Sequence, residues 1–175
     1  IHITEDYDVP RVINGGWQLS AGHALERPLD LADASRAFNR LIDMGFDTFD
    51  CADIYTGVED FFGGIIRERR KAGLRLPQIH TKFVPDLNDL ANVTPAYVEN
   101  IITRSLRRLG VERLDAVQFH WWDYSVPGMV DVAGELVRLQ EKGLIRLIST
   151  TNFNAVELRK LIDAGIPVAT NQCQY

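Results

Sequence analysis

The sequence TPAYVENIITRSLRRLGVERLDAVQFH (residues 94–120) has the pattern of one helix followed by one strand. Thr94 suits the N-cap, and Pro95 suits the first helical position because its missing N–H would have no partner there. Gly110 then ends the helix, and the apolar run LDAVQFH (114–120) is typical of a buried strand. This stretch therefore predicts one repeating unit of an α/β protein.

The same alternation extends in both directions from this unit. Strand-like stretches recur roughly every thirty residues, and a helical pattern that ends in glycine lies between successive strands. The predicted strands are 11–17, 46–52, 77–83, 114–120, 144–150 and 167–174, and the predicted helices are 31–45, 58–73, 94–110, 129–143 and 155–165. This order predicts consecutive βα units, a parallel sheet and a single domain over residues 1–175.

Two architectures share this pattern, the (β/α)8 barrel and the open doubly wound sheet. A doubly wound sheet that binds a dinucleotide normally carries G-x-G-x-x-G after its first strand. NGGWQLSAGH (14–23) lacks that spacing, so we expect a (β/α)8 TIM-barrel type of fold.

The predicted barrel is incomplete, because only six of its eight βα units can be counted in this chain. An open barrel leaves two strand edges and part of its core uncovered. We expect a fragment of a longer enzyme, with a second chain completing the barrel and a stand-alone degenerate form as the alternatives.

Composition and charge argue against several classes of function. The chain has 175 residues, 46% of them hydrophobic, and a formal net charge of −5 without a basic stripe, which disfavours nucleic-acid binding. Neither a transmembrane run nor a signal peptide is recognisable, so no membrane partner is expected. The two cysteines, Cys51 and Cys173, are too few for a disulfide framework. A reducing cytoplasm is the expected location.

Charged or polar groups lie at the carboxyl ends of five predicted strands, where a (β/α)8 barrel carries its chemistry. They are Asp50 with Tyr55 close behind it, Lys82, His120, STTN (149–152) and NQCQY (171–175). Taken singly, most of them have structural explanations such as turn capping or packing. Lys82 is the exception, because a buried lysine needs a carboxylate partner. Asp50, at the same end of the neighbouring strand, is the predicted partner.

One of these stretches, GFDTFDCADIYTGVED (45–60), resembles the aldo-keto reductase pattern G-x-x-x-x-D-x-A-x-x-Y-G-x-x-E. It departs from the pattern at Thr56, where the family has glycine, while Glu59 keeps its offset from Tyr55. Further blocks resemble the same family in order, namely IHTKF (79–83), RSLRRLGVERLDAVQFHW (104–121), TNFN (151–154) and NQCQY (171–175).

The resemblance implies NAD(P)H-dependent reduction of an aldehyde or ketone, with NADP(H) favoured over NAD(H) and no metal. It implies a catalytic tetrad made of Asp50, Tyr55, Lys82 and His120. It also implies a cofactor site formed by Asp50, Thr151, Asn152 and Gln172, of which the last three would hold the nicotinamide carboxamide. The family more often has serine at the position of Thr151, and the hydroxyl group is retained.

In this interpretation, Tyr55 is the general acid that protonates the substrate oxygen. An ordinary phenol has a pKa of about 10. The ammonium of Lys82 is expected to lower that pKa, and Asp50 is expected to hold the ammonium in place. His120, as the neutral imidazole, is expected to hydrogen-bond the substrate oxygen.

Two tryptophans are candidate apolar walls for the carbonyl substrate. Trp17 lies at the end of the first predicted strand, and Trp121 follows His120. Packing is the alternative role for each of them, and Trp122 is expected to be structural.

Two other functions remain open on the same residues. A cofactor-binding regulatory subunit would sense the redox state of the nucleotide without turnover. An unrelated barrel could use Lys82 to form a Schiff base, but such a lysine needs a lowered pKa, which pairing with Asp50 would oppose.

Overall fold

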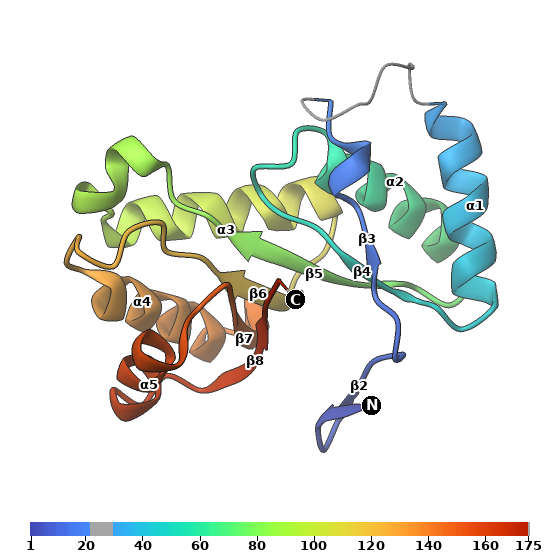
Figure 1. Cartoon of the computed structure of the whole chain (residues 1–175). Coiled ribbons are helices and arrows are strands. Elements are labelled where there is room, and N and C mark those ends of the chain that lie inside the picture. Colours follow the sequence, from blue (N-terminus) through green and yellow to red (C-terminus); the bar gives the residue numbers. More distant parts are fainter. Residues whose placement is uncertain (22–29, 175) are drawn as a thin grey trace.

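In the computed structural model, a curved parallel sheet of six strands is covered on its outer side by helices (Figure 1). The structure describes residues 1–21 and 30–174, so Gly22, His23 and Tyr175 of the stretches quoted above lie outside it. The strands are β1 (His2–Thr4), β2 (Tyr7–Asp8), β3 (Asn14–Gly15), β4 (Thr48–Asp50), β5 (Gln78–Phe83), β6 (Leu114–Phe119), β7 (Ile145–Thr151) and β8 (Val168–Gln172). The helices are η1 (Trp17–Leu19), α1 (Leu31–Asp43), α2 (Val58–Lys71), η2 (Leu87–Asn92), α3 (Pro95–Leu109), α4 (Met129–Glu141) and α5 (Ala155–Asp163).

The order of the strands confirms the barrel type of winding. The sheet runs β3-β4-β5-β6-β7-β8, and every neighbouring pair in it is parallel. Because each strand pairs with the next one in the sequence, the winding never reverses as it does in a doubly wound sheet. Within the described residues, β3 and β8 each pair on one side only, so the barrel is open at these two edges.

The helix boundaries follow from the capping residues in the sequence. The Thr94 side chain accepts a hydrogen bond from the backbone N–H of Tyr97 at 3.2 Å, and Asn154 caps α5 in the same way. Gly110 has a φ of 68°, a left-handed conformation that glycine adopts without steric cost. Both predicted N-caps are therefore confirmed.

The first strand is shorter than predicted. The sequence favours a strand over 11–17, but only Asn14–Gly15 pair with β4. At Gly16 the chain turns into η1, and a Cβ there would lie 2.9 Å from side-chain atoms of both Val58 and Phe62. Close packing against α2 therefore ends the strand at this glycine.

Aromatic packing joins the outer face of the sheet to the helices. Phe49 on β4 stacks on Phe62 of α2 with 5.3 Å between ring centroids, and Phe38 of α1 contacts both rings edge-on. Phe49 and Phe62 are fully buried, and each such side chain stabilises the fold by about 1.5–3 kcal/mol.

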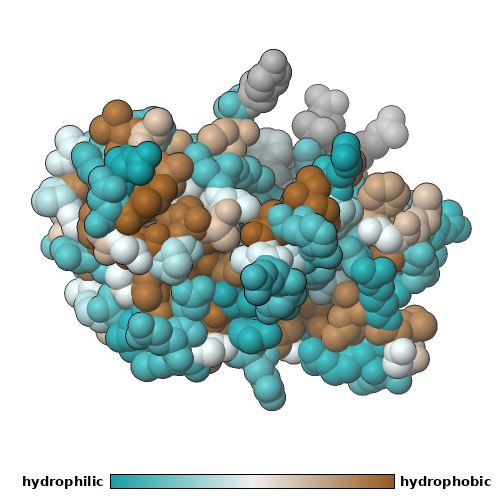
Figure 2. Space-filling view, turned by 90° about the horizontal axis from the view of Figure 1, so that it is seen from below, coloured by the Kyte–Doolittle hydropathy of each residue, from teal (hydrophilic) through white to brown (hydrophobic). Residues whose placement is uncertain are grey.

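An N-terminal hairpin of β1 and β2, which the sequence analysis missed, lies below the sheet in the view of Figure 1. The Tyr7 hydroxyl lies 3.0 Å from Nε2 of His80, and Tyr7 and Val9 form an apolar cluster with Ala116 and Leu147. Burial lowers the pKa of His80 to about 4, so its imidazole is neutral at physiological pH. Seen from below, the surface mixes polar and apolar residues (Figure 2).

In the part of the chain that the structure describes, no helix combines the length and the apolar character needed to cross a bilayer.

Candidate active site

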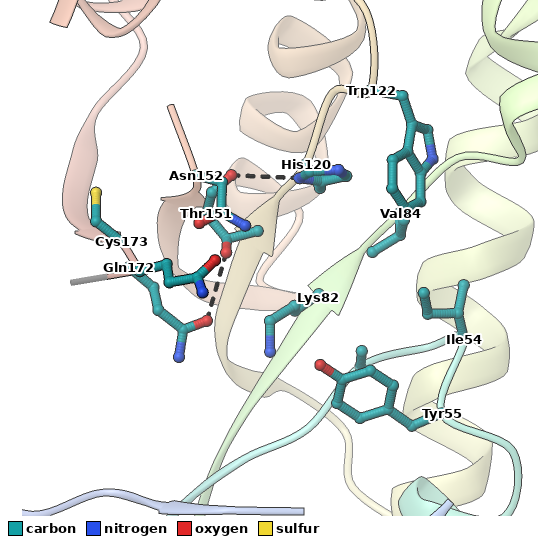
Figure 3. A pocket seen from close by; sticks show the side chains of 12 residues that line it. Ile54, Tyr55, Lys82, Val84, His120, Trp122, Thr151, Asn152, Gln172 and Cys173 are labelled. Atoms are coloured by element: carbon teal, nitrogen blue, oxygen red, sulfur yellow. Dashed lines mark hydrogen bonds between the residues drawn. The ribbon is translucent and has the colours of Figure 1, made fainter. Parts of the chain in front are cut away.

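The carboxyl ends of the strands surround a cavity of about 420 Å³ (Figure 3). The parallel register places Asp50 opposite His80 of β5 and Lys82 opposite Gln118 of β6, so side chains from neighbouring strands meet at one rim. The volume lies within the usual range for small-molecule sites. Six of the predicted residues line the cavity, namely Tyr55, Lys82, His120, Thr151, Asn152 and Gln172.

Lys82 and Asp50 form the predicted ion pair. The Lys82 ammonium lies 2.7 Å from each carboxylate oxygen of Asp50, and it also donates to the carbonyl oxygen of Cys51 at 2.8 Å. Only 6% of Lys82 is exposed. All three donors of a lysine ammonium can therefore be satisfied here, which a buried cation requires.

Gln118, which the sequence analysis missed, is part of this network. Its side-chain amide donates to Oδ1 of Asp50 at 2.8 Å, and only 4% of the residue is exposed. Gln172 donates to the same oxygen at 3.1 Å. Strand periodicity could have identified Gln118 as a residue of the site. Gln118 precedes His120 by two residues in a predicted strand, so the two side chains lie on the same side of the sheet.

Tyr55 lies beside this pair, but its acidity differs from the prediction. The Lys82 ammonium is 5.2 Å from the centroid of the Tyr55 ring, over its face. Burial, followed by the negative charge of Asp50, raises the pKa of Tyr55 to about 12. The expected lowering by Lys82 is absent because Asp50 neutralises the ammonium. The phenol therefore stays protonated over the neutral pH range.

His120 is held by the strand next to its own. Its Nδ1 lies 3.3 Å from the carbonyl oxygen of Thr151, which selects the tautomer with the proton on Nδ1. Burial lowers the pKa of His120, so the ring is neutral as predicted. In this tautomer Nε2 is an acceptor, whereas the predicted hydrogen bond to a substrate carbonyl needs a donor.

The tryptophans differ from the prediction. Trp121 is 1% exposed and packs in the core, and its indole N–H donates to the carbonyl oxygen of Val126. Trp17 lies in η1 and is outside the described lining of the cavity. Trp122 lines the cavity instead, edge-on to the His120 ring at 4.4 Å between centroids. Successive residues point to opposite sides of an extended chain, so only one of the two neighbouring tryptophans can face the cavity.

The residues predicted to hold a carboxamide lie together but are not equally available. Gln172 already uses both ends of its amide, because its Oε1 accepts from the Thr151 hydroxyl at 3.4 Å and its Nε2 donates to Asp50. Asn152 has a φ of 60°, the left-handed region that asparagine tolerates best after glycine. Its side-chain amide makes no hydrogen bond within the described residues, so it fits a carboxamide that offers both a donor and an acceptor.

Comparison with known proteins gives a consistent picture. The Aldo/keto reductase family matches residues 11–175. The methylglyoxal reductase DkgA of Yersinia pestis is 29% identical over 169 residues, which is 95% of this chain and 53% of that protein. The chloroplastic pyridoxal reductase of Arabidopsis thaliana is 29% identical over 176 residues, which is 91% of this chain and 44% of that protein. The chain thus spans about half the length of these curated relatives.

Solved structures with the same fold are likewise longer than this chain. An aldo-keto reductase of Bombyx mori, solved in complex with NADP, superposes with a TM-score of 0.77 at 24% identity, covering 95% of this chain and 55% of that chain. The present chain therefore corresponds to part of a (β/α)8 barrel. The match over nearly its whole length shows that it belongs to the aldo/keto reductase family.

Proposed function

We propose that this protein reduces a small aldehyde or ketone to an alcohol, using a reduced nicotinamide cofactor and Tyr55 as the proton donor. The observation that carries the proposal is the buried Lys82–Asp50 pair next to the Tyr55 ring, in a cavity at the strand ends. The reductase names of the relatives support the same class of reaction.

The chemistry of each side chain follows from charge. Bound cofactor would supply the hydride, and negative charge then builds on the substrate oxygen, which a positioned O–H donor stabilises. The raised pKa of Tyr55 keeps its proton in place for donation. The Lys82 ammonium lies over the Tyr55 ring and balances the charge of Asp50, which would otherwise oppose the phenolate that remains. In the reverse direction, Nε2 of His120 can accept from the alcohol.

The cofactor is proposed to be NADP(H), held at its carboxamide by Thr151, Asn152 and Gln172. Support comes from the available amide of Asn152 and from the Bombyx mori reductase of the same fold, which was solved with NADP. Gln172 would exchange its hydrogen bond to Thr151 for one to the cofactor.

The remaining barrel units are proposed to come from a longer form of the chain or from a second chain, because both sheet edges lack a partner strand among the described residues. A cytoplasmic location is part of the proposal, and the free thiols of Cys51 and Cys173 support it.

A second candidate function is a regulatory subunit that binds the cofactor with negligible turnover. The observation that favours it is the pKa of Tyr55, because a phenol raised to about 12 is a weak acid in the absence of ligands. Consumption of reduced cofactor separates the two functions.

The test follows the absorbance of NADPH with methylglyoxal as the substrate, chosen from the name of the Yersinia pestis relative. The assay uses the chain alone and a fusion to the C-terminal part of that relative, so that an incomplete barrel is not mistaken for an inactive site. Tyr55→Phe should lower turnover by about 10²–10⁴-fold, the usual contribution of general acid catalysis, without weakening NADPH binding.

The matched control is Tyr97→Phe, which removes a hydroxyl that lies outside the lining of the active-site cavity. If Tyr55→Phe and Tyr97→Phe showed equal turnover, Tyr55 would not be the general acid. Tight NADPH binding with no turnover in the unsubstituted fusion would favour the regulatory subunit.

A further inference from the structure

The loop that carries Tyr55 separates the active-site cavity from a second cavity of about 650 Å³. Ile54 of this loop and Val84, which follows β5, line both cavities. The conformation of this short loop therefore determines where the Tyr55 hydroxyl lies, and the residues that hold the loop lie on the side of the second cavity.

Asp53 holds the loop through both its side chain and its backbone carbonyl group. Its Oδ1 accepts from the backbone N–H of Val84 at 3.1 Å, and its Oδ2 lies 3.1 Å from Nη2 of Arg104 on α3. Its carbonyl oxygen accepts from Nη1 of Arg108 at 3.0 Å. The Asp53 side chain is 1% exposed. Two residues before Tyr55, the chain is thus fixed to both β5 and α3.

A second buried carboxylate holds the other side of the loop. Glu59 on α2 accepts from the Thr81 hydroxyl at 2.7 Å and lies 3.2 Å from Nη1 of Arg108. Arg108 therefore links the two sides of the Tyr55 loop, whereas Arg104 has its ion pair with Asp53 and with no other carboxylate among the described residues.

The charges around the Asp53 carboxylate oppose one another. The charged residues around it are Glu59 from α2, Arg104 and Arg108 from α3, and Asp86 and Arg107, which line the second cavity. Burial and the charge of Glu59 raise the pKa of Asp53 to about 7, against the lowering effect of Arg104. The fold thus buries a carboxylate that is only half ionised near neutrality. A neutral asparagine could also accept the hydrogen bond from Val84.

We propose that Asp53 is a positioning residue, whose carboxyl group joins the loop to the end of β5 and to α3 so that Tyr55 lies over Lys82. Loss of this carboxyl group leaves the backbone N–H of Val84 and the Arg104 guanidinium without their partner on the loop. The catalytic consequence rests on the proposed function, whereas the order of the loop does not depend on it.

The first experiment measures amide hydrogen exchange of residues 52–57 in the unsubstituted chain and in two variants of Asp53. Asp53→Ala should lose about tenfold in protection, because it removes both contacts of the carboxyl group. Asp53→Asn should retain most of the protection, because its amide keeps an acceptor for Val84 and removes a charge that burial disfavours.

Two further variants sharpen the measurement. Arg104→Gln removes the partner of the Asp53 carboxylate on α3, so it should also lower the protection of residues 52–57. Asp33→Asn removes a carboxylate from an exposed pair with Arg36 on α1, and it should behave like the unsubstituted chain. Protection in Asp53→Ala equal to that in Asp33→Asn would overturn the proposal. If Asp53→Ala does not fold, unchanged protection in Arg104→Gln overturns it.

The second experiment measures carbonyl reduction in the fusion protein. Asp53→Ala should lower kcat by about tenfold and leave NADPH affinity unchanged, because small displacements of a catalytic group are costly, whereas Asp53→Asn should restore most of the loss. Unchanged kcat in an active fusion would overturn the positioning role. Absence of turnover in the unsubstituted fusion and in every variant would contradict the proposed function. Hydrogen exchange would then still decide whether Asp53 orders the loop.

Discussion

At the scale of single residues, the site depends on the Asp50 carboxylate, which accepts hydrogen bonds from side chains on three other strands. Oδ1 of Asp50 accepts hydrogen bonds from Lys82 on β5, Gln118 on β6 and Gln172 on β8. These donors offset the cost of burying the charge, which would otherwise be several kcal/mol for each ion. The ion pair therefore fixes geometry at the rim, and its net contribution to stability is small.

Removing one partner of this pair should cost more stability than removing both. Lys82→Met leaves a buried carboxylate without its cation, and we expect a loss of about 3–5 kcal/mol in the free energy of unfolding. Asp50→Leu combined with Lys82→Met should be closer to the unsubstituted chain than either single variant. Urea unfolding of the three variants measures this. Simple additivity of the two single effects would contradict the expected coupling.

The pH dependence of stability should reveal a second pair of buried groups with opposite effects. Asp53 has its pKa raised from 3.8 to about 7, so between those values the folded chain keeps a proton that the unfolded chain has lost. Its contribution to stability therefore falls as pH rises through this window. His80 has its pKa lowered from 6.5 to about 4, so its contribution rises over a similar window. The two contributions largely cancel in the unsubstituted chain.

Asp53→Asn should remove one of these contributions and reveal the other. The free energy of unfolding of this variant, relative to the unsubstituted chain, should rise by up to about 4 kcal/mol between about pH 4 and pH 7 and then level off. Urea unfolding across this range measures the difference, with Asp33→Asn as the exposed control. A difference that does not change with pH would show that Asp53 ionises normally in the folded chain.

At the scale of the elements, the contact between α2 and α3 depends on one glycine. A Cβ built on Gly63 would lie 2.1 Å from the carbonyl oxygen of Arg108, whereas the neighbouring Gly64 has open space. Gly63 thus lets α3 approach closely enough for Arg108 to reach Glu59 and the Tyr55 loop.

Alanine substitutions at these adjacent glycines should have opposite effects. Gly63→Ala forces the helices apart, and we expect it to destabilise the fold by about 1–3 kcal/mol or more. Gly64→Ala should stabilise it by about 0.5–1 kcal/mol, because alanine is the better helix former and meets no neighbour. Thermal unfolding of both variants measures the contrast. Equal effects would show that the close approach is not needed.

The elements that the sequence predicts well are those whose signals are local. The cap at Thr94 and the left-handed turn at Gly110 come from short-range chemistry, and both are present in the structure. The β1–β2 hairpin was missed because its strands have only three and two residues and are stabilised by distant contacts such as Tyr7 with His80. The first strand was predicted too long because its end depends on packing of Gly16 against α2.

The same distinction applies to the site. Pairing of Lys82 with Asp50 followed from residue type and strand position, because a buried lysine needs a carboxylate. The direction of the Tyr55 pKa did not follow, since it depends on the burial of the phenol and on how completely Asp50 neutralises the ammonium. The spacing of two residues between His120 and Trp122 favours Trp122 over Trp121 as the residue that faces the cavity, a signal that the prediction of Trp121 did not use.

At the scale of the whole molecule, the open sheet has a cost. Within the described residues, β3 and β8 each leave one side of the strand without a partner, and β8 is mostly half-buried rather than covered. Unpaired edges of a parallel sheet offer hydrogen-bonding groups and apolar surface to other chains. This arrangement favours association of one chain with another unless the missing βα units cover the edges.

The isolated chain should therefore associate with itself as its concentration rises. Sedimentation velocity over a wide range of concentrations should show an increasing average mass, because the edges pair between molecules. In the fusion to the C-terminal part of the Yersinia pestis relative, added βα units cover both edges, so the mass should not change with concentration. A monomeric isolated chain over the same range would show that the two edges are protected without further strands. The fusion is then the matched control, since it keeps every residue of the open sheet and changes only what lies beside β3 and β8.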